Sequence, residues 1–234
     1  IDGVENTIEV SNSCNNLKRI IFSSSRMVCR IDYVPKDEFD FGRCTLYGES
    51  KKLGENIIRK SNVNAQWIIV RPTSIWGPWF DVPYKIFFTT IQKKVYFNPG
   101  NFNPFKSFGF VGNTIYQLYK IFQAPASLID KRTYYLCDYP PLKLKNWADL
   151  IRIEMGLKPI HTYPYYLLKL AASIGDVLYK LGLYNVPIQS FRLSNLITNM
   201  VYDTQELEEL CGDLPYSLEQ GVKETVKWLI NYKK

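Results

Sequence analysis

Histidine is nearly absent from this sequence, and its cysteines show no metal-binding spacing. The one histidine among 234 residues is His161, which excludes a multi-histidine metal site and is interpreted as structural or exposed. The five cysteines are odd in number and include no C-x-x-C pair: Cys14, Cys29, Cys44, Cys137 and Cys211. We therefore predict no metal site, and a reducing compartment, the cytoplasm, as the location of the protein.

Blocks of like charge are also missing. The net charge of +7 is spread along the chain in short pairs such as Lys51/Lys52 and Lys93/Lys94. Such pairs are typical of a solvated surface, and a phosphate-bearing substrate is the next interpretation. We predict no nucleic-acid partner, because binding to nucleic acid calls for a clustered basic patch.

No apolar run is long and uncharged enough to cross a membrane. The longest is residues 165–183, and it carries Lys169, Asp176 and Lys180, whereas a spanning helix needs about 20 mostly uncharged residues. Its apolar residues repeat at helical spacing, with these charges on the opposite face. We predict an amphipathic helix facing the core; a membrane-surface helix is the alternative.

The sequence has no G-x-x-G-x-x-G turn, and it opens at Ile1 in what reads as a helix already under way. A dinucleotide-binding fold opens with a strand, a glycine-rich turn and a helix. We therefore expect a fragment whose isolated chain is poorly soluble and binds NAD(P) weakly.

The chain does contain enough apolar residues for a folded core, at 46% of the sequence. It also contains a pair of residues whose chemistry suits an active site. Tyr47 and Lys51 stand four apart and share one face of a helix predicted over residues 46–60. Free tyrosine titrates near pH ~10, and a lysine ammonium one turn away stabilises the phenolate. Tyr47 is therefore a candidate general acid/base, although this spacing also arises by chance.

Two strands flank this helix. Residues 18–23 form an apolar run that ends in the hydroxyls of Ser23, Ser24 and Ser25, and residues 66–71 lead into Arg71-Pro72-Thr73-Ser74. Unbroken apolar runs are typical of parallel strands covered on both faces, and strand, helix, strand in this rhythm predicts a βαβ unit. A third strand is predicted over residues 133–137.

The order of these features, with the serines first, then the Tyr/Lys helix and then the Arg-Pro strand end, resembles that of the extended short-chain dehydrogenases/reductases. Among these enzymes it resembles the NAD-dependent epimerase/dehydratase branch, which acts on nucleotide-sugars. The resemblance covers residues 1 to about 228. It implies an α/β fold: a Rossmann-like parallel sheet, incomplete at the N-terminus, with a small C-terminal substrate-binding lobe. It also implies NAD or NADP as the cofactor.

The resemblance also assigns roles to residues. It implies that Tyr47 exchanges the proton, Lys51 binds the ribose and favours the phenolate, and Ser25 orients the substrate. A strand-end cap is the structural alternative for the serines. The implied cofactor-binding residues are Ser23, Ser24, Tyr47, Lys51, Arg71, Pro72 and Thr73, and the implied substrate-binding residues are Ser25, Ser74, Trp76 and Arg192. Cys29-Arg30 stands where the family often has Tyr-Gly, so the resemblance assigns no substrate contact to that loop.

Domain boundaries follow from the same reading. Residues 1–78 and 105–156 are predicted to be the remainder of the cofactor-binding domain, and residues 79–104 and 157–234 the substrate-binding lobe. A helix is predicted over residues 113–122 with Ile115, Leu118, Tyr119 and Phe122 facing inward, and a homodimer through the Tyr47/Lys51 helix. Two other functions stay open: a hydroxysteroid-type or other alcohol/ketone oxidoreductase, and a non-catalytic binding or sensor protein of the same fold.

Overall fold

Three apolar runs of the sequence form the central sheet of the computed structural model, which describes residues 2–30, 32–42, 44–82, 84–184, 186 and 188–232. The strands are β1 (Arg19–Ser23), β2 (Gln66–Pro72) and β7 (Thr133–Leu136), in the order β1-β2-β7. Both pairings are parallel, with Ile21 opposite Ile68 and Val70 opposite Tyr134. The predicted α/β fold with a parallel, Rossmann-like sheet is confirmed.

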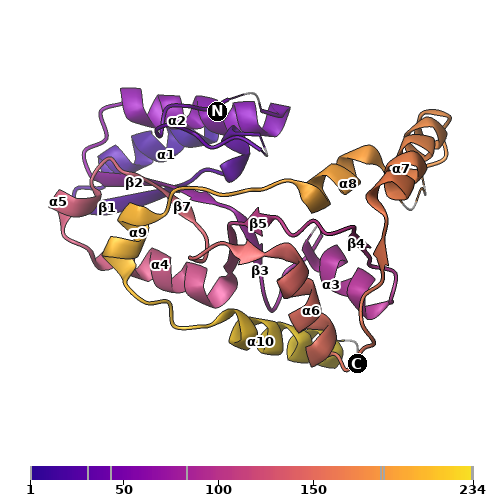
Figure 1. Ribbon diagram of the computed structural model, residues 1–234. Helices are drawn as coiled ribbons and strands as arrows, with labels where there is room; N and C mark the ends of the chain where they lie inside the picture. Colours follow the sequence, from indigo (N-terminus) through magenta and orange to yellow (C-terminus); the bar gives the residue numbers. More distant parts are fainter. Residues whose placement is uncertain are drawn as a thin grey trace. The chain divides into compact units, whose positions relative to one another are not determined.

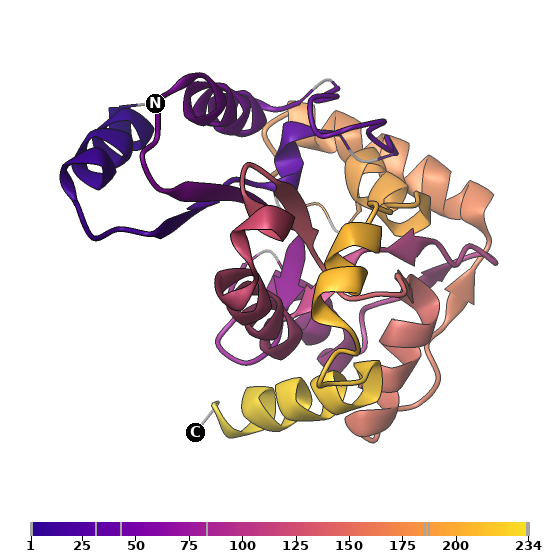
Figure 2. The same cartoon turned by 90° about the vertical axis from the view of Figure 1, so that its left-hand side faces the viewer.

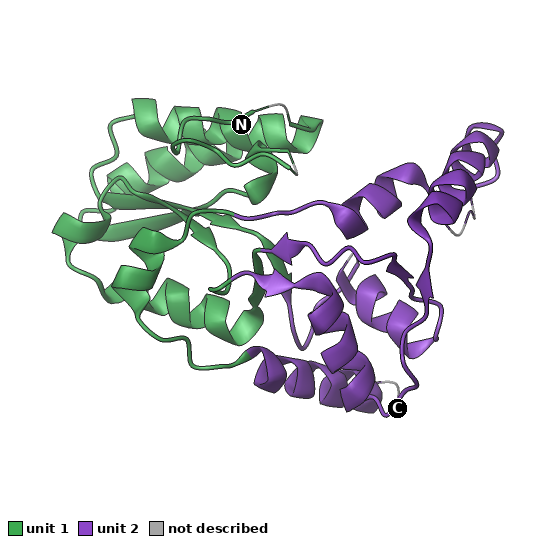
Figure 3. Cartoon of the chain, in the orientation of Figure 1, with its two compact units in different colours: residues 1–75, 107–140, 202–217 green, residues 76–106, 141–201, 218–234 purple. Residues whose placement is uncertain are grey.

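This sheet belongs to the first of two compact units, which comprises Ile1–Ile75, Ser107–Pro140 and Tyr202–Ser217 (Figure 3). Side chains of β2 alternate between its two faces, because successive residues of a strand point to opposite sides. Trp67 and Ile69 pack in a core with Ile8 and Ile58 from α1 (Asp2–Ser13) and α2 (Leu46–Lys60).

The other face of the sheet is covered by α4 (Val111–Gln123), α5 (Ala126–Ile129) and α9 (Gln205–Cys211). Ile68 and Val70 pack there with Ile121 and Leu207. α4 and α9 lie side by side, and the two helices α1 and α2 lie across the sheet from them (Figures 1 and 2). Smaller elements of this unit are η1 (Arg26–Val28) and β6 (Phe108–Phe110), which pairs with β3 (Ser74–Trp76).

The second unit comprises Trp76–Lys106, Pro141–Val201 and Leu218–Lys234. Its helices are α3 (Tyr84–Gln92), α6 (Leu144–Glu154), α7 (Tyr165–Lys180), α8 (Ser190–Ile197) and α10 (Leu218–Asn231). Short strands pair within it: β4 (Asn98–Pro99) with β9 (Thr162–Tyr163), and β5 (Phe105–Lys106) with β8 (Leu142–Lys143). Its core is aromatic, with Phe87 stacked on Trp147 at 4.6 Å between ring centres.

Two sequence-based expectations about helix faces are wrong. In α4, Leu118 packs against the core as predicted, but Ile115, Tyr119 and Phe122 are exposed, while Asn113 and Gln117 are buried. Polar residues occupy the inner face because they bind the end of β7 and its continuation. The Gln117 amide donates to the Cys137 carbonyl at 2.7 Å, and the Asn113 amide donates to Asp138 at 3.1 Å.

For α7, the sequence pattern predicts an apolar face turned to the core. Its buried residues are instead Ala172 and Gly175, while Leu168 and Leu178 are partly buried and Leu167, Leu170, Ile174 and Val177 are exposed. Within the described residues, no helix is long and apolar enough to cross a membrane.

Candidate active site

The candidate site lies where β1 ends and α2 begins. α2 starts at a capped turn, in which the Thr45 hydroxyl accepts a hydrogen bond from the Gly48 amide at 3.1 Å. Tyr47 follows in the first turn with 51% of its surface exposed. One turn later, the Lys51 ammonium donates to the Ser23 carbonyl at 3.0 Å and lies 5.8 Å from the centre of the Tyr47 ring. The cation thus joins the end of β1 to the Tyr47 side chain.

Gly48 allows α2 to approach the segment that follows the serines. A Cβ atom at Gly48 would lie 2.1 Å from the Met27 carbonyl oxygen, a distance that no side chain tolerates. Glycine next to Tyr47 is therefore required for α2 to pack against η1. Ser25 caps η1, and its hydroxyl oxygen accepts from the Met27 amide at 3.2 Å. The hydroxyl still has its proton to donate.

Ser24 and Thr73 are committed to internal hydrogen bonds. The buried Ser24 hydroxyl donates to the Glu55 carboxylate at 2.5 Å, and the Thr73 hydroxyl donates to the Leu136 carbonyl at 3.0 Å. Ser74 is buried, and Pro72, which ends β2, is partly buried. The roles predicted for these four residues in binding cofactor or substrate stay predictions.

Arg71 and Glu55 form a buried ion pair beneath the site. Arg71 is 0% exposed and Glu55 1%, and the guanidinium donates to both carboxylate oxygens, at 2.9 and 2.7 Å. It also donates to the Tyr135 hydroxyl at 2.9 Å. Burial alone would lower the pKa of Arg71, but its bonds with Glu55 reverse the effect, and its pKa is raised. The cofactor-binding role predicted for Arg71 stays a prediction.

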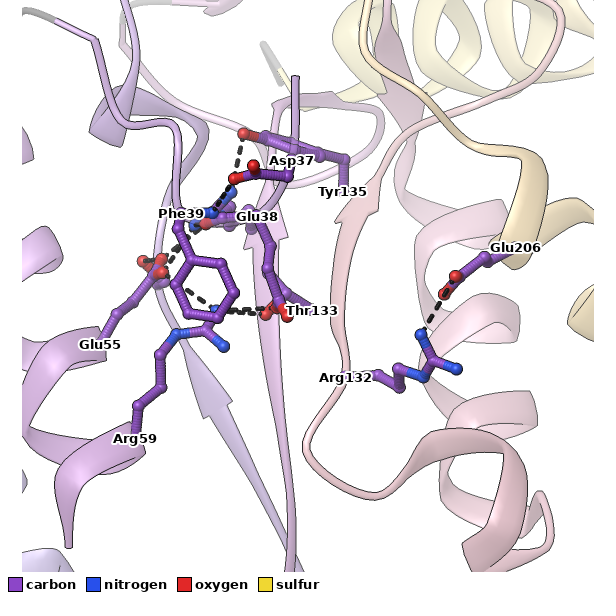
Figure 4. A network of polar contacts seen from close by, with 11 residues as sticks. Asp37, Glu38, Phe39, Glu55, Arg59, Arg132, Thr133, Tyr135 and Glu206 are labelled. Carbon is purple, nitrogen blue, oxygen red and sulfur yellow. Dashed lines mark hydrogen bonds and ion pairs between the residues drawn. The ribbon is translucent and has the colours of Figure 1, made fainter. Parts of the chain in front are cut away.

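A second arginine extends this network (Figure 4). Arg59 makes an ion pair with Glu38 at 2.9 Å and donates to the Thr133 hydroxyl at 2.6 Å. The loop before α2, the helix α2 itself and the strands β2 and β7 are thereby joined by charged side chains. This network holds the helix that carries Tyr47 and Lys51 against the sheet.

Sequence reasoning missed Glu55. The signal was present, because Tyr47, Lys51 and Glu55 follow one another at four-residue spacing and share one face of α2. A charged residue inside an apolar strand, as Arg71 is, also implies a buried partner.

Two predicted substrate residues belong to the second unit. Trp76 packs in the aromatic core, 5.1 Å from Trp147 and 5.9 Å from Phe88 between ring centres. Arg192 is exposed on α8. Their contacts with substrate stay predictions.

A cavity of about 290 Å³ opens in the first unit, lined by residues 35–38, Arg71, residues 132–135 and the start of α9 with its preceding residues 203–204. Tyr47 and Lys51 are not among its lining residues. The Tyr47/Lys51 pair therefore lies outside the lining of this cavity. In the described part of the chain, no cluster of three or more His, Cys, Asp or Glu residues could hold a metal ion.

Comparison with known proteins gives one curated sequence relative and many similar structures, while no family model matches. The relative is the N-acetyl-alpha-D-glucosaminyl-diphospho-ditrans,octacis-undecaprenol 4-epimerase of Escherichia coli O157:H7. It is 24% identical over 235 residues, which cover 97% of this chain and 70% of the relative.

Two solved structures have the same fold at low identity. UDP-glucuronic acid 4-epimerase from Bacillus cereus, in complex with UDP-glucuronic acid and NAD, matches with a TM-score of 0.71 and 12% identity, over 99% of this chain and 67% of that one. UDP-glucose 4-epimerase from Thermotoga maritima, with UDP-glucose, matches with a TM-score of 0.68 and 16% identity, over 100% and 70%. This chain is thus similar in sequence to one curated 4-epimerase, and it shares the fold of UDP-sugar 4-epimerases of known structure.

Proposed function

We propose that this protein is an NAD(P)-dependent epimerase that inverts a hydroxyl-bearing carbon of a sugar linked through a diphosphate. The observation that carries the proposal is the Lys51 ammonium, which lies beside the Tyr47 ring and binds the Ser23 carbonyl at the end of β1. The curated relative and the two structural neighbours are 4-epimerases of sugar diphosphates.

The donors at the site suit a dinucleotide's ribose. An ammonium has three N–H donors, and Lys51 uses one on Ser23, which leaves donors for ribose hydroxyls. The cofactor, when bound, supplies hydride transfer. As a phenolate, the half-exposed Tyr47 side chain takes the proton of the sugar hydroxyl, and as the resulting phenol it returns that proton, with the Lys51 ammonium 5.8 Å from its ring. Ser25 donates its hydroxyl proton to the sugar oxygen and orients it.

The two compact units suit two separate binding roles. We propose that the first unit binds the cofactor and the second the sugar diphosphate, with Arg192 as a donor to its phosphate oxygens. The homodimer through α2 is likewise a proposal, supported by the exposed Leu46 and Leu53 on that helix. A cytoplasmic location is proposed from the free cysteines of the described chain.

The test is Tyr47→Phe, which removes the proton-transferring oxygen and keeps the ring. We expect turnover of a UDP-N-acetylhexosamine to fall by about two to four powers of ten, the usual loss for a general acid/base. The readout is the ratio of C4 epimers by NMR. Tyr119→Phe, at a similarly exposed tyrosine on α4, is the control and should leave turnover unchanged.

Near-normal turnover by Tyr47→Phe would remove this residue from the mechanism. If the wild-type protein binds NAD(P) and the sugar diphosphate but does not interconvert epimers, a non-catalytic binding function is favoured instead.

A further inference from the structure

The outward face of α7 in the second unit is an apolar stripe. Helical residues advance about 100° each, which places six large side chains within one 100° sector. They are Tyr166, Leu167, Leu170, Ile174, Val177 and Leu181, and all are exposed. At the middle of the stripe, Leu170, Ile174 and Val177 are exposed by 62%, 54% and 57%. We call these six residues the α7 stripe.

The orientation of α7 is fixed by its opposite face. A Cβ atom at Gly175 would lie 2.0 Å from the Ile188 carbonyl oxygen, so the helix backbone lies directly against the segment before α8. Ala172 is buried on the same side. No side chain larger than that of glycine fits between the helix and this segment at position 175. A rotation of α7 that buried the stripe would bring larger side chains against the segment, so the stripe stays at the surface.

The surroundings of the stripe are basic and aromatic. Residues 165–197 contain three basic side chains and one acidic one, Asp176, whose carboxylate accepts from the Ser190 amide at 3.1 Å. Lys169 and Lys180 lie on one flank of the stripe by helical position. The exposed Leu183 and Tyr184 extend the apolar surface past the end of the helix. An apolar face flanked by lysines and tyrosines is typical of helices that lie in a membrane interface.

We propose that the α7 stripe docks on the surface of an anionic lipid bilayer and that the sugar diphosphate is carried on a polyprenyl lipid. The substrate part rests on the proposed function and on the curated relative, whose name specifies an undecaprenol-linked sugar diphosphate. A substrate with such an apolar tail stays in the bilayer, so its epimerase must work at the membrane surface. The stripe supplies the apolar contact, and the lysines supply attraction to anionic headgroups.

The test is flotation of the purified protein with vesicles of phosphatidylcholine and phosphatidylglycerol, and with vesicles of phosphatidylcholine alone. The variant carries Leu170→Gln, Ile174→Gln and Val177→Gln; the control carries Ile115→Gln, Tyr119→Gln and Phe122→Gln, an equally exposed apolar stripe on α4. We expect the wild type to float with the anionic vesicles and the α7 variant to lose about ten-fold or more in partitioning. The α4 control should float like the wild type.

Three results would overturn the docking proposal. The wild type could fail to float, the α7 variant could float as well as the wild type, or sedimentation could show a dimer that the α7 substitutions dissociate without any vesicle binding. Circular dichroism checks the fold of each variant. If the triple α7 variant loses helix content, the single substitution Ile174→Gln is tested in its place.

Flotation needs no turnover, so it is independent of the proposed epimerase. If the wild type turns over a water-soluble UDP-sugar, the α7 variant should retain that activity. The same variant should lose activity on a polyprenyl-diphosphate sugar in vesicles. Equal loss on both substrates would contradict the lipid-linked substrate. Flotation without turnover on either substrate would reject the epimerase and leave the docking intact.

Discussion

At the scale of single residues, the buried pair Glu55–Arg71 decides how firmly the candidate site is held. Glu55 accepts from Ser24 at the end of β1 and from Arg71 on β2, so one carboxylate joins two strands to α2. Removing one charge of a buried pair leaves the other without compensation. We expect Glu55→Gln to lower the free energy of unfolding by about 3–5 kcal/mol in urea denaturation.

The control is Glu49→Gln on the same helix. Its ion pair with Lys52 is long, at 3.7 Å, and solvent-accessible, so we expect a loss under about 1 kcal/mol. Replacing both members, Glu55→Met with Arg71→Met, should recover part of the loss, because no charge is then left unpaired. A Glu55→Gln effect as small as that of Glu49→Gln would show that the pair is not structural.

Asp138, which follows β7, gives a pH-dependent prediction. Burial raises the pKa of its carboxyl to about 7, against the opposing hydrogen bonds from the Phe110 and Asn113 nitrogens. Because the folded-state pKa lies above the unfolded value of about 3.9, folding binds a proton between these pH values. Stability from this group is complete below about pH 4 and is lost as the pH rises through 7.

We therefore expect the wild type to lose about 2–4 kcal/mol of unfolding free energy relative to Asp138→Asn between about pH 4 and pH 8. Urea denaturation across this range measures the difference. The exposed Asp213→Asn should run parallel to the wild type. A constant difference between wild type and Asp138→Asn would mean that Asp138 ionises normally in the folded protein.

At the scale of elements, the packing of α2 on η1 depends on Gly48. Alanine there would place a methyl group 2.1 Å from the Met27 carbonyl oxygen, and a backbone oxygen can move only with its whole segment. We expect Gly48→Ala to cost more than about 2 kcal/mol of stability, beyond any gain in helix propensity. Gly3→Ala in α1 is the matched control, because nothing lies within 4 Å of its Cβ position.

Gly3→Ala should stabilise the protein by about 0.5–1 kcal/mol, since alanine favours a helix over glycine. Thermal unfolding of the two variants checks the pair. Equal effects of the two substitutions would show that η1 yields easily and does not fix the position of Tyr47.

Which elements form could be predicted from the sequence, but which face each one buries could not. The strands β1, β2 and β7 were predictable because unbroken apolar runs suit a sheet covered on both faces. Periodicity also located the apolar stripes of α4 and α7. It predicted that both stripes face the core, which is wrong. Contacts with neighbouring backbone determine which face is buried: Gln117 binds the Cys137 carbonyl, and Gly175 lies against Ile188. Such contacts join a helix to a separate segment of the chain, and the periodicity of one helix does not contain them.

The candidate site was likewise predictable where its residues lie on one helix, and not where they come from several elements. Tyr47 and Lys51 could be predicted because both lie on one turn of one helix. Glu55 shares that helix face but was missed, because its partners Ser24 and Arg71 come from two strands that only the fold brings to it.

At the scale of the whole molecule, the chain passes between its two units at 75/76, 106/107, 140/141, 201/202 and 217/218. A cut between residues 140 and 141 therefore leaves parts of both units on each piece. Within the first unit, Leu207 of α9 is buried in the core formed by β2, α4 and β7. Within the second unit, Trp147 of α6 stacks on Phe87.

Each unit is thus completed only when both pieces are present. We expect co-expressed residues 1–140, carrying an affinity tag, to retain residues 141–234 through purification in native buffer and to release them in urea. Leu207→Asp together with Trp147→Ala should weaken this retention, because each substitution empties or charges a buried contact between the pieces. Recovery of residues 141–234 as a separate soluble species would mean that contacts within the units are too weak to hold two pieces together. The connectivity of the chain, rather than its packing, would then maintain both units.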